Sequence, residues 1–267
     1  MNISILGCGW LGLPLAKDLI TRGHTIKGST TSKEKMAVLT AERIIPYQVK
    51  LFEEGIQGDI ASFLNDAEVL IIDIPPGLRK DPNENFIAKI GRLKNQIDRS
   101  PVQHLIFISS TSVFEDREDM PAYTEDDEPN GTQINSEQLR GVEKLLYSDA
   151  FKTSIIRFGG LYGPGRHPVE YLSGRKNIKD PDAPVNLIHL DDCMGIISAI
   201  IATGAEGVFH GVNPQHPDKL QYYDAKARER NLPLPGFDHA TPSKGKFINS
   251  VRLEQELGFV FSKSLKD

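Results

Sequence analysis

The sequence predicts a doubly wound α/β fold, in which helices cover both faces of a parallel sheet. Strand and helix signals alternate through the first 160 residues, and the runs 69–74 and 104–108 are almost continuously apolar. Such strands, spaced by helices, are typical of a parallel sheet buried on both sides. Right-handed crossovers then give the doubly wound arrangement.

The individual elements follow from local patterns. Strands are expected over residues 2–6, 24–27, 44–49, 69–74, 104–108 and 154–158. Helices are expected over residues 11–22, 33–42, 86–97 and 136–147. Leu11, Leu15 and Leu19 share one face of the first helix, and Gly23 is a natural stop after it. Ser32 is expected to cap the second helix.

The pattern changes after Gly165. Alternation of strands and helices weakens there, and prolines become frequent. We therefore expect a cofactor-binding domain over residues 1–165. Residues 166–267 are expected to form mainly a smaller, substrate-side C-terminal lobe that is interleaved with the main domain, with some segments returning to its core.

Composition excludes several classes of protein. A net charge of −5 does not favour binding to nucleic acid or to a membrane surface. The longest apolar runs fall short of the roughly 18–20 residues that a membrane span requires. Two cysteines, Cys8 and Cys193, suit a reducing compartment, and no basic lead precedes the first apolar stretch. A cytoplasmic protein is expected.

A glycine-rich loop follows the first strand. Residues 7–12 read Gly-Cys-Gly-Trp-Leu-Gly, with a strand before them, a helix after them and a second strand close behind. This context predicts a Rossmann dinucleotide site, with glycines for a tight turn, for approach to the pyrophosphate and for helix packing. A plain glycine-rich turn is the alternative. Cofactor contacts are expected from Gly7, Gly9, Trp10, Leu11 and Gly12.

The end of the second strand indicates which cofactor is bound. NAD sites place a carboxylate there for the ribose hydroxyls, whereas residues 27–33 hold hydroxyls and lysines but no acid. Hydroxyls, backbone N–H groups and a lysine suit a 2′-phosphate, so NADP(H) is favoured over NAD(H). The alternative is that this run only caps the second helix. The residues concerned are Thr30, Thr31, Ser32 and Lys33.

Three further segments carry a resemblance. Residues 108–114 (Ile-Ser-Ser-Thr-Ser-Val-Phe), 156–165 (Ile-Arg-Phe-Gly-Gly-Leu-Tyr-Gly-Pro-Gly) and 186–192 (Asn-Leu-Ile-His-Leu-Asp-Asp) are similar to segments of the extended short-chain dehydrogenase/reductases, also called NAD-dependent epimerase/dehydratases. The resemblance covers nearly the whole chain. It implies nicotinamide-dependent chemistry on a small polar metabolite, with sugar nucleotides as one class.

The chain departs from that family at two points. Its glycine loop has G-x-G-x-x-G spacing, where most extended members have G-x-x-G-x-x-G. Asn135 and Leu139 stand where active members carry the Tyr-x-x-x-Lys pair. The chain's own Tyr222 and Lys226 have this spacing, but they are expected in a surface helix of the C-terminal lobe. These departures resemble the atypical subgroup that includes the YeeZ-like proteins.

The resemblance also implies site residues. Ser110 matches the family's catalytic Ser/Thr, with Thr111 as the weaker candidate; a serine that satisfies nearby backbone is the alternative reading. Pro75 and Pro76 are expected to let the backbone pass close to the adenosine half of the cofactor. Further cofactor contacts are expected from Ser109, Phe158, Gly159, Gly160 and Tyr162.

Substrate contacts are expected after the last of these strands. Arg166 can hold an anionic group and His167 can exchange a proton, although a solvated loop is the plainer reading for His167. His189 is a substrate candidate, but with Asp191 it is more readily explained as a structural hydrogen-bonded turn. The acidic stretch 115–128 is expected to be a solvated loop, and no metal site is expected.

The sequence thus predicts an NADP(H)-binding oxidoreductase or epimerase/dehydratase-like enzyme. Ser110 would orient the reacting oxygen, and water, His167 or the substrate would replace the missing tyrosine as proton source. The alternative is a cofactor-binding sensor or regulatory protein without turnover, which the missing pair favours. The expected partner is a small-molecule substrate, and the resemblance allows a homodimer.

Overall fold

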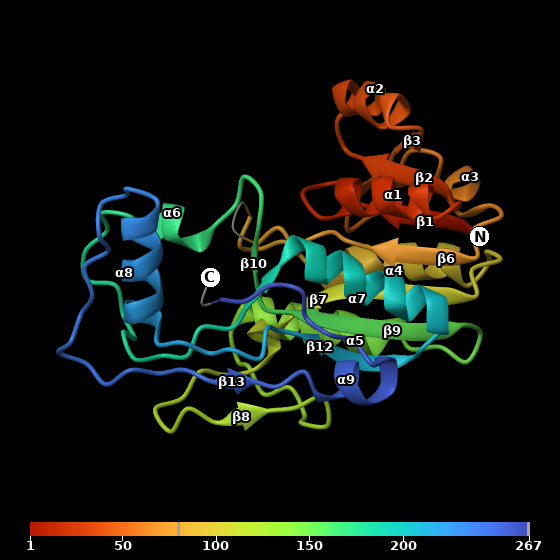
Figure 1. Ribbon diagram of the computed structural model, residues 1–267. Helices are drawn as coiled ribbons and strands as arrows, with labels where there is room; N and C mark the ends of the chain where they lie inside the picture. The colour runs from red at the N-terminus through yellow and green to blue at the C-terminus, as the bar shows by residue number, and fades with distance from the viewer. Residues whose placement is uncertain (79–80, 266–267) are drawn as a thin grey trace. The chain divides into compact units, whose positions relative to one another are not determined.

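The computed structural model describes residues 1–78 and 81–265. Its central element is a seven-stranded sheet in the order β12-β9-β7-β6-β1-β2-β3 (Figure 1). The pairs β1–β2, β1–β6, β2–β3 and β6–β7 are parallel. The predicted doubly wound α/β fold is therefore confirmed. β2 and β3 lie on one side of β1, and the later strands of the sheet lie on its other side, so the strand order reverses at β1. Sheets of this kind bind ligands where the order reverses.

The predicted strands form with shifted ends. They are β1 (Asn2–Leu6), β2 (Thr25–Thr30), β3 (Ile45–Gln48), β6 (Val69–Ile72), β7 (His104–Ser110) and β9 (Lys152–Phe158). β2 and β7 run past their apolar residues because buried hydroxyls, such as those of Ser29 and Ser109, continue them. The edge strand β12 (Gly207–Gly211) is missing from the prediction, since it is short and bounded by glycines.

The helices of the first 160 residues form where periodicity predicts them, to within about two residues. They are α1 (Gly12–Thr21), α2 (Lys33–Ala41), α4 (Phe86–Ile97) and α5 (Ile134–Leu146), with a short α3 (Ile60–Leu64) in addition. In α4 the apolar face Phe86, Ile90, Leu93 and Ile97 is buried, and the Asn85 side chain caps the first turn by accepting from the Ala88 N–H.

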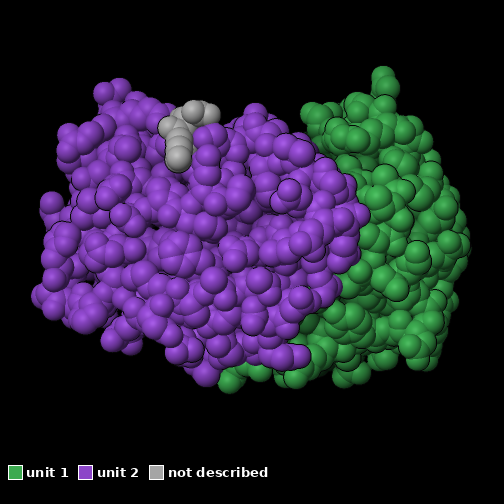
Figure 2. All heavy atoms as spheres, turned by 60° about the horizontal axis from the view of Figure 1, so that its bottom comes forward, with its two compact units in different colours: residues 1–110, 133–156, 197–208 green, residues 111–132, 157–196, 209–267 purple. Residues whose placement is uncertain are grey.

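The chain divides into two compact units, coloured separately in Figure 2. Unit 1 comprises residues 1–110, 133–156 and 197–208, and unit 2 comprises residues 111–132, 157–196 and 209–267. Unit 1 also holds the small ladder β4 (Lys50–Leu51) with β5 (Ile56–Gln57). Helix α7 (Leu190–Thr203) has residues in both. The division of roles at residue 165 remains a prediction.

Unit 2 has two small ladders of its own. One pairs β10 (Gly160–Tyr162) with β11 (Leu187–His189), and the other pairs β13 (Phe247–Ile248) with β8 (Ala122–Tyr123). Its short helices are η1 (Thr111–Val113), α6 (Pro168–Leu172), α8 (Lys219–Glu229) and α9 (Val251–Leu257). Within residues 1–78 and 81–265, none of the helices combines the length and apolarity that crossing a bilayer demands.

Candidate functional site

The three glycines of the loop between β1 and α1 have different surroundings. Gly7 has φ +108°, and a Cβ there would lie 2.2 Å from the Asp73 carbonyl oxygen. A Cβ at Gly12 would lie 2.2 Å from the Gly7 carbonyl oxygen. Gly9 is exposed, and a Cβ there would meet nothing within 4 Å. Gly7 and Gly12 are thus required by the protein's own packing, whereas Gly9, whose N–H donates to the Gly7 carbonyl at 2.8 Å, is the one of the three with free space beside its Cα.

Ser29, at the end of β2, holds this loop in place. Its hydroxyl accepts from the Gly7 N–H at 3.0 Å, and its carbonyl accepts from the Cys8 N–H at 2.8 Å. The N-cap residue of α1, Leu11, makes no side-chain capping bond, and no acidic residue lies in the first turn of the helix. The N-terminal end of the helix dipole therefore faces the loop, although the Asp73 carboxylate lies close by, 3.2 Å from where a Cβ at Gly12 would stand. Sequence reasoning missed Ser29, whose only signal is a hydroxyl inside a buried strand.

Cys8 has a structural part in the loop. Its side chain is buried, and a Cβ at Gly28 would lie 2.6 Å from its sulfur. Position 28 of β2 therefore has room only for glycine. Burial, together with the nearby Asp73 carboxylate, raises the pKa of the Cys8 thiol to about 12. The thiol therefore stays protonated at neutral pH and is unsuited to nucleophilic chemistry.

The segment after β2 has a carboxylate beside it, that of Glu34. Ser32 occupies the N-cap position of α2, but its hydroxyl donates to Glu34 Oε2 at 2.5 Å and makes no capping bond. The expectation that the Ser32 side chain caps this helix is therefore wrong. Thr30 is buried, whereas Thr31 and Lys33 are exposed. Glu34 lies one residue beyond the acid-free stretch and brings a carboxylate to the same place.

The two serines at the end of β7 differ. Ser109 is buried, and its hydroxyl donates to the buried Glu143 carboxylate of α5 at 2.6 Å. Ser110 is half-buried at the last position of the strand, and Thr111 is buried where η1 begins. The Ser109 hydroxyl is thus already used inside unit 1, and Ser110 is the more exposed of the two serines.

Helix α5 carries no tyrosine–lysine pair. Asn135 and Leu139 occupy one face of it, and Glu143 follows on the same face one turn later. Leu139 is buried and apolar, so it cannot lower the pKa of a neighbouring group as a lysine does. Glu143 was missed by sequence reasoning because its partner Ser109 is 34 residues away.

The remaining predicted cofactor contacts have surroundings of their own. Pro75 is exposed and Pro76 half-buried after the end of β6. Phe158 is buried, and a Cβ at Gly159 would lie 2.6 Å from the Asn186 carbonyl oxygen. Gly160 donates its N–H to the same carbonyl at 2.8 Å. Close backbone packing in unit 2 is therefore sufficient reason for Gly159, whereas a Cβ at Gly160 would meet the Leu187 side chain at 2.5 Å.

Unit 2 contains a pocket of about 370 Å³, bounded in part by the backbone of residues 163–165. Its side chains include three of the predicted residues and both members of the Tyr-x-x-x-Lys match. They are Tyr162, His167, His189, Tyr222 and Lys226, and Arg230 also lines the pocket. Arg166 is half-buried and is not among the residues that line the pocket. The prediction of a helix at residues 222–226 is correct, but Tyr222 is only 5% exposed, so the surface reading is wrong for it.

His167 is buried rather than part of a solvated loop, which corrects the plainer reading. Its Nδ1 accepts from the Val169 N–H at 3.1 Å and so caps α6, while its Nε2 lies 3.2 Å from the Tyr222 hydroxyl. Burial, followed by the nearby Arg230 and Lys226 cations, lowers the pKa of His167 to about 4. The ring is therefore neutral at pH 7.

The turn at His189 has the hydrogen bonds expected of it. His189 Nδ1 accepts from the Asp191 N–H at 3.1 Å, and the Asp191 carboxylate pairs with Lys263 at 3.0 Å. Burial lowers the pKa of His189, against the opposing effect of Asp191. Its ring also packs edge-on against Tyr162, with centroids 5.0 Å apart, so the turn borders the pocket.

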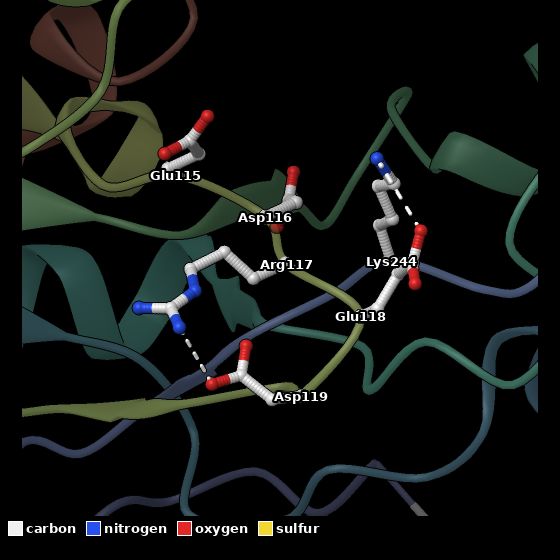
Figure 3. A pocket seen from close by; sticks show the side chains of 6 residues that line it. All are labelled: Glu115, Asp116, Arg117, Glu118, Asp119 and Lys244. Carbon is white, nitrogen blue, oxygen red and sulfur yellow. Dashed lines mark hydrogen bonds and ion pairs between the residues drawn. The ribbon is translucent and has the colours of Figure 1, made fainter.

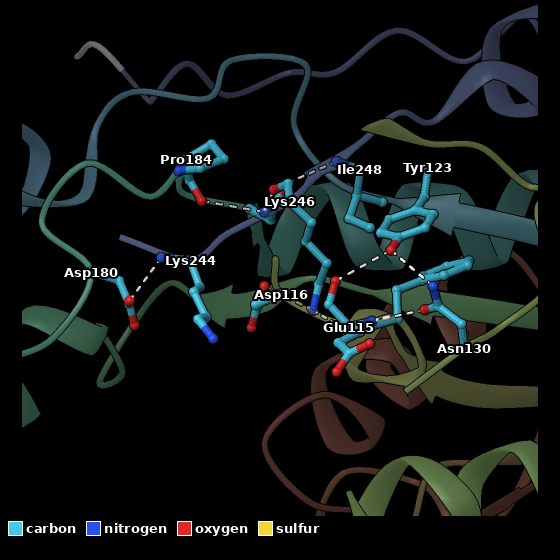
Figure 4. Close-up of polar contacts among 11 residues, drawn as sticks. Glu115, Asp116, Tyr123, Asn130, Asp180, Pro184, Lys244, Lys246 and Ile248 are labelled. Carbon is cyan, nitrogen blue, oxygen red and sulfur yellow. Dashed lines mark hydrogen bonds and ion pairs between the residues drawn. The ribbon is translucent and has the colours of Figure 1, made fainter. Parts of the chain in front are cut away.

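Most of the acidic stretch 115–128 is a solvated surface. Figure 3 shows a shallow hollow lined by residues 115–119 and Lys244, in which Arg117 pairs with Asp119 at 2.8 Å and Lys244 with Glu118 at 3.6 Å. Figure 4 shows the neighbouring Lys246, whose Nζ donates to the Phe114 carbonyl at 2.7 Å. No group of metal-binding side chains was found among the residues that the structure describes.

Glu125 is the exception in this stretch, because it is buried. Its carboxylate accepts from three backbone N–H groups, those of His210 at 3.1 Å, Val251 at 3.2 Å and Arg252 at 3.3 Å. It therefore joins the end of β12 to the start of α9. The expectation of a solvated loop is wrong at this residue.

Comparisons with known proteins agree with this architecture. No family model matches the sequence. Protein YeeZ of Escherichia coli (strain K12) is 31% identical over 265 residues, which cover 97% of this chain and 95% of that protein.

Solved structures of low identity share the fold. The UDP-glucuronic acid 4-epimerase of Bacillus cereus, in complex with NAD, superposes with a TM-score of 0.81 at 16% identity, over 100% of this chain and 93% of the other. A human epimerase family protein with NADPH superposes with a TM-score of 0.74 at 16% identity, over 99% and 96%.

Proposed function

The chain belongs to the YeeZ family, and from this premise we propose that it binds a nicotinamide dinucleotide at the glycine loop and works on a small polar metabolite as an oxidoreductase or epimerase/dehydratase-like enzyme. The observation that carries the proposal is the contrast within the loop. Gly7 and Gly12 have no room for a Cβ, whereas Gly9 has open space beside it close to the start of α1. This combination suits a pyrophosphate.

NADP(H) is the cofactor that we propose, in preference to NAD(H). Lys33 is exposed at the start of α2, and β2 ends in hydroxyls instead of the carboxylate typical of NAD sites. Glu34 opposes this preference, because hydrogen bonds from Ser32 and from backbone lower the pKa of its carboxyl and keep it charged. The structural neighbours are found with either cofactor, NAD in the Bacillus cereus epimerase and NADPH in the human protein.

Ser110 is the group that we propose to orient the reacting oxygen, with Thr111 as the weaker candidate. A bound nicotinamide would supply hydride transfer, and the half-buried Ser110 hydroxyl would hold a carbonyl or alcohol oxygen in place. In this proposal residues 1–165 serve the cofactor and residues 166–267 serve mainly the substrate. Sugar nucleotides are one substrate class, as in the neighbour that is a UDP-glucuronic acid 4-epimerase.

The second candidate function is a cofactor-dependent sensor without turnover. The observation that favours it is the face of α5, where Asn135 and Leu139 replace the proton-transferring pair. The two functions share cofactor binding and differ in hydride transfer. Ser110→Ala separates them, since an enzyme would lose turnover while binding cofactor normally, whereas a sensor shows no turnover to lose.

Cofactor binding is tested with a pair of glycine variants. Trp10 is the one tryptophan of the chain and lies in the loop, so its fluorescence reports titration with NADPH and NADH. Gly9→Ala should weaken NADPH binding at least about tenfold without lowering the melting temperature, because the added Cβ meets only the ligand.

The matched control for this variant is Gly55→Ala. A Cβ at Gly55 also meets nothing within 4 Å, but Gly55 lies outside the glycine loop, in the turn between β4 and β5. It should therefore change neither affinity nor stability. Unaltered NADPH binding by Gly9→Ala would contradict the proposed site, and tighter binding of NADH than NADPH by the wild-type protein would contradict the cofactor preference.

A further inference from the structure

The pocket of unit 2 contains two phenol groups that its own residues do not fully satisfy. The Tyr162 hydroxyl is buried and has no hydrogen-bond partner among the residues that the structure describes. Tyr222 is buried too, and its hydroxyl bonds to His167 in the described part of the chain. Buried hydroxyls are nearly always hydrogen-bonded, so these two indicate a place that a ligand or water completes.

The direction of the His167–Tyr222 hydrogen bond follows from the backbone. The Val169 N–H donates to Nδ1 of His167, so Nδ1 carries a lone pair and not a proton. The proton of the neutral ring is therefore on Nε2, and Nε2–H donates to the Tyr222 oxygen at 3.2 Å. Tyr222 accepts this bond, which leaves its own O–H to be donated elsewhere.

The charged side chains at the pocket also favour an anionic ligand. Lys226 and Arg230 line it, and they are balanced by Glu229, which pairs with Lys226 at 2.8 Å, and by Glu170, which pairs with Arg230 at 3.2 Å. Of these two carboxylates only Glu229 lines the pocket, so cations exceed anions along its wall. Two hydroxyl donors beside two cations are suited to an oxyanion.

We propose that this pocket is a binding site for the carboxylate or phosphate group of a small ligand, with the hydroxyl of Tyr222, oriented by His167, as a donor to the oxyanion. Tyr162 supplies the second hydroxyl, and Lys226 and Arg230 supply the charge. The volume of about 370 Å³ is that of a site for a small molecule or part of one. If the proposed function holds, this ligand is the substrate; binding of the anion itself does not depend on the proposed function.

Binding is tested by calorimetric titration with benzoate, phenyl phosphate and, as a neutral relative, benzamide. At least one of the two anions should bind, and benzamide should bind at least about tenfold more weakly, since hydrogen bonds to charged groups are the stronger ones. The ratio of the two anion affinities distinguishes a carboxylate site from a phosphate site. Equal binding of benzamide, or no binding of either anion, would overturn the proposal.

Matched tyrosine variants test the role of the hydroxyl. Tyr222→Phe should weaken binding of the anion about tenfold or more, whereas Tyr223→Phe, also buried in α8 but not at the pocket, should leave it unchanged. Glu229→Gln should strengthen binding because it removes the anion that pairs with Lys226. Wild-type affinity in Tyr222→Phe would overturn the assignment.

A measurement on the unaltered protein covers the case in which a variant fails to fold. In protein labelled with ¹⁵N-histidine, the ring of His167 should show the Nε2–H tautomer at pH 7; an Nδ1–H tautomer or a doubly protonated ring would overturn the proposal. Gly9→Ala separates this inference from the proposed function. Normal anion binding by Gly9→Ala would show that the anion site does not depend on the cofactor site. If wild type binds the anion but not NADPH, only the proposed function is contradicted.

Discussion

The glycine loop of unit 1 is shaped by the main chain, whereas the pocket of unit 2 is shaped mainly by side chains. The loop consists of backbone: its shape depends on Gly7 and Gly12, where a Cβ has no room, and on one buried hydroxyl, that of Ser29. The polar groups of the pocket belong to side chains, and those of His167 and Tyr222 are joined by a hydrogen bond. The glycine loop depends on the absence of side chains at its glycines, whereas the pocket depends on which side chains the fold brings together.

The largest expected effect tests how far unit 2 depends on individual side chains. Glu125→Ala removes the acceptor of three backbone N–H groups and should lower the free energy of unfolding by about 3 kcal/mol or more, since buried donors left unsatisfied are costly. Urea unfolding measures it. Asp126→Ala is the control, because Asp126 is exposed and its ion pair with Arg252 lies at the surface. Equal losses in the two variants would contradict the role of Glu125.

The next effect tests the backbone site. In Gly12→Ala the new Cβ would lie 2.2 Å from a backbone oxygen, so the start of α1 must move. We expect a loss of about 2 kcal/mol in unfolding free energy, a usual cost of overpacking, together with weaker NADPH binding. Gly9→Ala is the comparison, since it should affect binding alone. A Gly12→Ala protein as stable as wild type would show that the loop is less rigid than its packing indicates.

A smaller, pH-dependent effect sharpens the view of the pocket. Burial lowers the pKa of His167 to about 4 from a usual 6.5, so the folded state favours the neutral ring. The unfolded chain takes up the proton first as pH falls, and the resulting loss of stability grows from about pH 6.5 down to about pH 4. His167→Asn, whose Oδ1 stands where Nδ1 does and can still accept from the Val169 N–H, should lose less stability than wild type between pH 7 and pH 5. Parallel losses in urea midpoints would mean that His167 is not held neutral.

The smallest effect concerns cofactor preference. Glu34→Gln removes an exposed carboxylate from the segment proposed to hold the 2′-phosphate, next to Lys33. NADPH affinity should rise about twofold to fivefold at low salt and less at high salt, because charges at an exposed surface are screened. NADH affinity should stay the same. An equal rise for both cofactors would place Glu34 away from the phosphate.

The same contrast explains what could be predicted from the sequence. The sheet and the first helices follow from periodicity, and the glycine loop follows from spacing, because both are local in the chain. The Ser109–Glu143 bond joins residues 34 apart, and the His167–Tyr222 bond joins residues 55 apart. No local pattern reports such pairs. Glu125 was taken for surface because its neighbours are acidic, although the backbone groups that it accepts from lie 85 to 127 residues away.

The buried thiols give each unit a reporter of its own unfolding. Cys8 lies in unit 1 and Cys193 in unit 2, and both are buried in the folded protein. A thiol reagent therefore modifies either residue only when the structure around it opens, so the labelling rate of each measures the stability of its own surroundings. If cofactor binds the glycine loop, it should slow the modification of Cys8 more than that of Cys193, without any substitution in the chain.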